Sequence, residues 1–119
     1  MRTLLGALVI TTGAFAVVPA LAQESDCVAP SDGTRFEFED PTGSTIRLEW
    51  RASRDGAKLR IQLSDDGEFG RLLIDREMCC EAKLRSLDVG RYHWRVMDVD
   101  AEAEQCRASF EIVAIPKPE

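Results

Sequence analysis

The sequence predicts an all-β fold, a disulfide-stapled sandwich of seven short strands in two sheets. Apolar and polar residues alternate with a period of two in several segments, and no sustained helical period appears. Glycine, proline and aspartate turns separate these segments about every 8 to 12 residues, a spacing typical of sandwiches. The clearest alternation follows a turn at residues 87–90, where Tyr92, Trp94 and Val96 share one face.

The expected strands follow one another in chain order. The first begins near Cys27, is interrupted by Pro30 and continues over residues 35–39. The next six are expected at residues 46–51, 59–63, 69–75, 78–84, 87–99, which includes the corner before the strand, and 107–115. The strand at 69–75 alternates least regularly, which is typical of a sheet edge. Residues 116–119 form an extended tail that contains two prolines.

Residues 1–22 have the pattern of a cleaved secretory signal peptide. Arg2 precedes an apolar run, and small residues at Ala20 and Ala22 favour cleavage before Gln23. The run is shorter than the roughly 20 residues of a membrane span. We therefore expect a soluble, periplasmic or secreted chain with its sandwich at residues 23–115, and no membrane association after cleavage.

The mature chain is acidic. Without Arg2, the 15 basic side chains become 14 against 21 acidic ones, which gives a formal charge of −7. Such a surface argues against nucleic acid as a partner and steers the protein towards cationic partners.

Several segments resemble the fibronectin type III-like domain of bacterial envelope proteins. They are Leu48-Glu49-Trp50, residues 59–63 with the turn at 66–69, residues 87–92, and Trp94-Arg95-Val96. The resemblance implies that Trp50 lies in the core, and that the Tyr92 hydroxyl bonds back to the backbone near the preceding corner. Alternation places Trp94 inward on the same face as Tyr92. It concerns architecture and implies little about a ligand. Four cysteines are unusual for such domains.

Cys27, Cys79, Cys80 and Cys106 all lie in the exported part, where two disulfides are expected. Alternating strand directions place all four at one pole of the sandwich. Side-chain parity favours Cys80 with Cys106 between the sheets and Cys27 with Cys79 outside. The second interpretation joins Cys27 to Cys106 and closes a vicinal, reducible Cys79-Cys80 ring. A zinc site is less expected because no Cys-x-x-Cys pair is present.

Nothing in the sequence predicts catalysis, a cofactor or a metal. His93 is the only histidine, so it forms neither a triad nor a histidine metal site. Asp65, Asp66 and Glu68 adjoin Gly67, and turn chemistry explains them better than calcium binding. Phosphate-binding loops and hydrolase motifs do not appear in the sequence.

Two oppositely charged loops are expected at the cysteine end, and we call their charged residues the loop pole. The loop between the second and third strands supplies the basic members, and that between the sixth and seventh supplies the acidic ones. They are Arg51, Arg54, Lys58, Asp98, Asp100, Glu102 and Glu104. These charges are either simply solvated or form a binding surface that the disulfides make rigid.

These observations predict a small, exported, non-enzymatic binding or adaptor module that recognises a protein partner in the cell envelope. One alternative is an acidic inhibitor of a cationic envelope enzyme such as a lysozyme. Another is a thiol–disulfide redox protein that uses Cys79 and Cys80.

Overall fold

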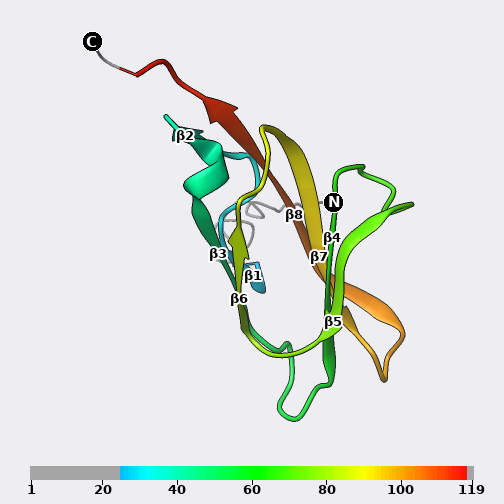
Figure 1. The fold of residues 1–119 in the computed structure, drawn as a ribbon. Coiled ribbons are helices and arrows are strands. Elements are labelled where there is room, and N and C mark those ends of the chain that lie inside the picture. Colours follow the sequence, from blue (N-terminus) through cyan, green and yellow to red (C-terminus); the bar gives the residue numbers. More distant parts are fainter. Residues whose placement is uncertain (1–24, 118–119) are drawn as a thin grey trace, which may run out of the picture.

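Two β-sheets face each other in the computed structural model, which describes residues 25–117 (Figure 1). One sheet has the strand order β1-β3-β6, with β1 at Cys27–Ala29, β3 at Thr45–Trp50 and β6 at Glu81–Arg85. The other has the order β2-β8-β7-β4-β5, with β2 at Thr34–Phe38, β8 at Ala103–Ala114, β7 at Gly90–Asp98, β4 at Leu59–Ser64 and β5 at Leu72–Glu77. A short 3₁₀ turn, η2, spans Pro41–Gly43. The all-β sandwich is confirmed, whereas the proposed signal peptide lies outside the described residues.

The first expected strand is two strands, so the described chain has eight rather than seven. β1 pairs antiparallel with β3, while β2 pairs parallel with β8 in the opposite sheet. Pro30 lacks the N–H that a continuous ladder needs, and Gly33 adopts the positive φ of 84° that the crossing requires. The Gly33 N–H then donates to the Ser109 carbonyl at 2.8 Å, which starts β2 beside β8.

β8 begins at Ala103, earlier than predicted, whereas β5 and β6 begin later because a turn occupies the first residues of each expected strand. Phe69 lies in the β4–β5 loop at a φ of 58°, so β5 begins only at Leu72. Asp66 folds this loop by accepting the N–H groups of Glu68 at 2.7 Å and Gly70 at 3.2 Å. Residues 78–80 likewise connect β5 to β6 rather than extending a strand.

The core lies between the sheets and follows the predicted alternation. The three-stranded sheet contributes Ile46, Leu48, Trp50 and Leu84, and the five-stranded sheet contributes Leu59, Ile61, Leu63, Tyr92, Trp94, Val96, Ala108, Phe110 and Ile112. The rings of Trp50 and Trp94 meet edge to face across the sheets, with centroids 6.2 Å apart. Both tryptophans are therefore core residues, as the resemblance implied for Trp50 and alternation predicted for Trp94.

Tyr92 forms the expected corner at the start of β7. Its hydroxyl donates to the Asp88 carbonyl at 2.8 Å, and its ring stacks on Phe110. This backbone bond agrees with the fibronectin type III-like sandwich that the sequence resembles.

Candidate functional site

The β3–β4 loop and the β7–β8 turn meet at one end of the sandwich (Figure 1). The Val99 N–H donates to the Lys58 carbonyl at 2.8 Å, which joins the two segments directly. The structure thus brings together the two loops that the sequence placed at the loop pole.

Arg54 and Asp98 form the main contact between these loops. Arg54 Nε and Nη2 donate to the two Asp98 carboxylate oxygens at 3.1 and 3.0 Å, a bidentate pair. Asp98 is only 5% exposed, and it also accepts the Ala101 N–H at 3.1 Å. The Arg54 hydrogen bond, together with backbone N–H donors, lowers the pKa of Asp98. Asp98 is therefore positioned to hold the loops together rather than to face a partner.

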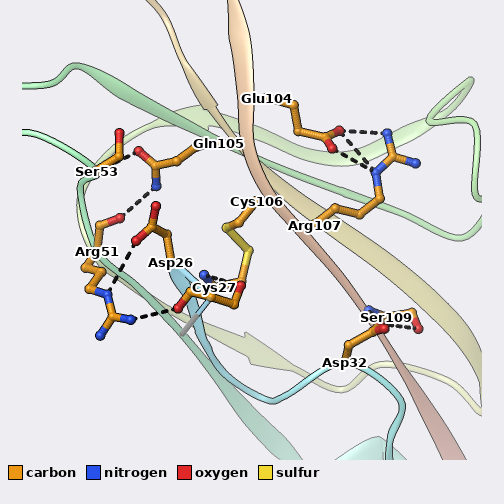
Figure 2. Close-up of a disulfide and its surroundings, with 11 residues drawn as sticks. Asp26, Cys27, Asp32, Arg51, Ser53, Glu104, Gln105, Cys106, Arg107 and Ser109 are labelled. Atoms are coloured by element: carbon orange, nitrogen blue, oxygen red, sulfur yellow. Dashed lines mark hydrogen bonds and ion pairs between the residues drawn. A yellow bond between two sulfur atoms is a disulfide. The ribbon is translucent and has the colours of Figure 1, made fainter. Parts of the chain in front are cut away.

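Gln105, which the sequence analysis did not single out, ties the β3–β4 loop to β8 (Figure 2). Its side-chain oxygen accepts the Ser53 N–H at 3.0 Å, and its amide nitrogen donates to the Arg51 carbonyl at 2.7 Å. A single polar residue in an alternating strand carries no sequence signal for this role. Only the pairing of the two segments reveals it.

Two predicted members of the loop pole point elsewhere. Arg51 donates through Nη2 to the Ser25 carbonyl at 3.0 Å, and its Nε lies 3.4 Å from the Asp26 carboxylate (Figure 2). Glu104 instead bonds the Arg107 guanidinium at 2.6 Å on the outer face of the five-stranded sheet. Its other cationic neighbour is Arg95, at 3.7 Å.

The remaining members stay exposed at the loop pole. Lys58, Asp100 and Glu102 are solvent-exposed, and Asp100 lies 4.0 Å from Arg54. Asp55, in the same β3–β4 loop, is also exposed. A partner can contact these residues and the exposed half of the Arg54 side chain.

The disulfides differ from the pairing that side-chain parity favoured. Cys27 pairs with Cys106 at a Cα–Cα distance of 5.6 Å, and Cys79 pairs with Cys80. Parity failed because Cys79 and Cys80 lie in the β5–β6 turn rather than on a strand. Cys27 is inward-facing and buried on β1, and its bond to β8 joins the two sheets.

The backbone of Trp50 contacts cysteines on both neighbouring segments. Cys27 lies opposite Trp50 in the β1–β3 ladder, and the Trp50 N–H donates to the Cys80 carbonyl at 2.9 Å. The vicinal pair therefore lies close to the core tryptophan and to the start of β1.

A hollow of about 410 Å³ lies beside the Cys27–Cys106 bond. Its lining combines apolar and small groups with charged ones: Ser25, Cys27, Val28, Ser31, Asp32, Arg51, Arg107 and Ala108. Val28 is 43% exposed although it is apolar. The Asp32 carboxylate is held by the Ser109 N–H at 2.8 Å and hydroxyl at 3.0 Å (Figure 2). The hollow can accept a side chain that has both apolar and polar parts.

The other candidate residues have local contacts. Asp66 organises its own turn, and the N–H donors of Glu68 and Gly70 lower its pKa. The His93 ring lies against Gly67 on the outer side of the sheet. Within residues 25–117, no group of three or more His, Cys, Asp or Glu side chains is arranged to hold a metal ion. In that same part of the chain, no helix has the length and apolar character needed to cross a membrane.

Comparisons with known proteins give a similarity to solved structures but no match by sequence. No protein-family model matches the sequence, and no curated protein is significantly similar to it. Among solved structures, the fibronectin(III)-like modules of CbhA from Clostridium thermocellum superpose with a TM-score of 0.46 at 16% identity. The match covers 77% of this chain and 97% of that chain.

Proposed function

We propose that this protein is a small exported binding module that recognises a protein partner through its loop pole and the adjoining hollow. The observation that carries the proposal is the concentration of cross-links at this end. The loops are joined by the Arg54–Asp98 pair and held to β8 by Gln105, beside the Cys27–Cys106 disulfide.

These cross-links support recognition because they fix the loops before a partner arrives. Loops at the end of a sandwich are ordinarily its more mobile parts. Ordering a side chain or loop on binding costs free energy, and a surface ordered in advance avoids that cost. The paired residues thus act as positioning residues for their exposed neighbours.

The exposed chemistry favours a basic partner. Arg54 and Arg51 are about half exposed, but the charge of each is balanced by its partner, Asp98 or Asp26. The other charged and exposed loop residues are Lys58 against Asp55, Asp100 and Glu102. An acidic surface of this kind accelerates association with a cationic protein. The hollow of about 410 Å³ is within the range of roughly 300 to 1,000 Å³ of ligand pockets, and it gives the partner a place to insert a side chain.

Export is supported by the chemistry of the cysteines and by the sequence of residues 1–22. A disulfide that joins two sheets is stable in an oxidising compartment, and the leader pattern directs a chain there. We therefore place the protein in the periplasm or outside the cell.

The experiment is affinity capture from an envelope fraction with the oxidised protein as bait. The test variant is Asp100→Lys with Glu102→Lys, which reverses exposed charges and spares Asp98, whose pairing holds the fold. We expect it to lose the captured partner while its Tm stays nearly unchanged.

The matched control is Asp65→Lys with Glu68→Lys, which makes the same charge change in the exposed β4–β5 loop at the other end. We expect this control to keep the partner. Capture that survives reversal at the loop pole, or that both variants lose equally, would contradict the proposal. If the captured partner is an enzyme and its activity falls when this protein is added, the protein is an inhibitor of that enzyme.

A further inference from the structure

Asp32, one of the residues that line the hollow, is held in a fixed position. It lies in the turn between β1 and β2, where the Ser31 carbonyl accepts the Thr34 N–H at 3.1 Å and the Thr34 hydroxyl at 2.6 Å. Gly33 supplies the positive φ of 84° at the third position of this turn. The Ser109 N–H and hydroxyl then hold the Asp32 carboxylate against β8 (Figure 2). The carboxylate is therefore in place before a ligand enters the hollow.

One oxygen of this carboxylate remains open. Both bonds from Ser109 go to Asp32 Oδ1, at 2.8 and 3.0 Å. Among the described residues, no hydrogen-bond donor reaches Oδ2, and no basic side chain forms an ion pair with Asp32. Asp32 is also solvent-exposed, so a ligand in the hollow can approach its carboxylate. The hollow thus offers one acceptor oxygen and one negative charge without a partner.

The two arginines that line the hollow are each balanced by an acidic side chain. Arg51 Nε lies 3.4 Å from the Asp26 carboxylate. Arg107 donates to the Glu104 carboxylate at 2.6 Å. An anionic ligand would have to compete with these acids for its contacts. A cationic ligand instead finds Asp32, the one charged lining residue without an oppositely charged partner in the part of the chain that the structure describes.

The hollow also presents an apolar surface. Val28 lines it and is 43% exposed, and Cys27 and Ala108 add small nonpolar groups. A long basic side chain buries its methylene stem on a surface of this kind and keeps its charged end at a polar group. The volume of about 410 Å³ is large enough for such a side chain.

We infer that the hollow binds a lysine side chain of the partner, with its ammonium group at Asp32 Oδ2 and its methylene stem against Val28. The inference rests on the proposed function, because it treats the hollow as part of the surface that the partner contacts. A guanidinium binds a carboxylate best as a fork to both oxygens, and Oδ1 already accepts two bonds. An ammonium group needs only the one open oxygen, so lysine fits better than arginine.

The first test adds a blocked lysine, N-acetyl-lysine N-methylamide, to the oxidised protein and follows the backbone amide signals by NMR. We expect shifts centred on Val28, Asp32 and Ser109. The norleucine analogue has the same carbon stem without the ammonium group, and it should bind about fivefold more weakly, as expected for the loss of an exposed ion pair. The arginine analogue should also bind more weakly. Shifts centred elsewhere, or a norleucine or arginine analogue that binds as tightly as lysine, would overturn the inference.

The second test is Asp32→Asn. Asparagine keeps an oxygen that can accept both bonds from Ser109, but its NH₂ group replaces the open acceptor. The Tm should stay nearly unchanged, while the affinity for the blocked lysine should fall about fivefold. Asp65→Asn, the same change at an exposed residue of the β4–β5 loop, should leave that affinity unchanged. Undiminished binding by Asp32→Asn, or an equal loss in both variants, would refute the site. If Asp32→Asn lowers the Tm, the parent decides, since added salt must weaken the lysine analogue and spare the norleucine analogue.

Capture of the partner separates this inference from the proposed function. As bait, Asp32→Asn should retain less of the partner than Asp65→Asn does. If Asp100→Lys with Glu102→Lys abolishes capture but Asp32→Asn captures as well as the parent, the loop pole binds the partner and the lysine site is wrong. If Asp32→Asn reduces capture and the reversal at the loop pole does not, the lysine site stands and the loop pole is not the surface that the partner contacts.

Discussion

Two buried polar side chains hold the ends of β7 through hydrogen bonds to neighbouring segments. Near its start, the Tyr92 hydroxyl donates to the Asp88 carbonyl. At its end, Asp98 accepts from Arg54 and from the Ala101 N–H. Because β7 pairs with both β4 and β8, these two residues set the geometry of the corner and of the loop pole.

Tyr92→Phe removes only the hydroxyl and leaves the ring stacked on Phe110. The loss of one buried hydrogen bond should lower the free energy of unfolding by about 1 kcal/mol. For a domain of this size that lowers the Tm by about 4 to 8 °C, measurable by calorimetry. A Tm within a degree of the parent would mean that the bond to Asp88 adds nothing to stability.

Asp98→Asn should change how stability depends on pH. Arg54 and the backbone donors lower the pKa of Asp98 in the folded state below its unfolded value of about 3.9. The stabilisation is therefore present above the unfolded pKa and is lost as pH falls through the folded pKa. Urea unfolding between pH 7 and pH 2 should show the parent losing more stability than the variant.

At pH 7 the Asp98→Asn variant should unfold at lower urea concentrations than the parent, and the two should converge in acid. Asp66 and Asp75 also have lowered pKa values, the first through backbone N–H donors and the second through Arg60, so the variant keeps part of the acid sensitivity. Curves that run parallel over the whole range would show that Asp98 does not contribute through its charge.

At the scale of the elements, the alternation of apolar and polar residues predicted the strands that bury one face. It did not predict the boundaries of strands next to a turn that packs on the sheet. Trp50, Tyr92 and Trp94 are core residues because inward positions of β3 and β7 recur with a period of two. The sequence pattern predicts a strand that begins at Phe69. Phe69 is instead a loop residue packed on the outer face of the sheet, where Arg95 lies 4.2 Å and Arg107 5.1 Å from its ring centroid.

The candidate site was likewise predictable only in part. Strand direction alone predicted that the two charged loops meet, but not which charges pair with one another. Arg54 finds Asp98, whereas Glu104 turns to Arg107 and Gln105 bridges to the β3–β4 loop. These choices depend on side-chain reach across non-neighbouring strands, which sequence spacing does not encode.

The two disulfides should differ widely in their contribution to stability. Cys27–Cys106 closes a loop with a sequence separation of 79, and Cys79–Cys80 closes a ring of adjacent residues. The chain-entropy relation assigns about 4.5 kcal/mol to the first and only about 1 kcal/mol to the second. Urea unfolding of the Cys27→Ser/Cys106→Ser and Cys79→Ser/Cys80→Ser variants would measure both values. Equal losses would contradict an entropic origin.

The disulfide between Cys27 and Cys106 also determines how the fold responds to mechanical force. Tension applied through Cys27 and through the segment after Cys106 passes directly across the sulfur atoms, so the 79-residue separation between them carries none of the load. A chain of that length would otherwise extend by up to about 270 Å. The oxidised protein can thus lengthen only where its chain lies outside this ring, which makes it a nearly inextensible link when held at both ends.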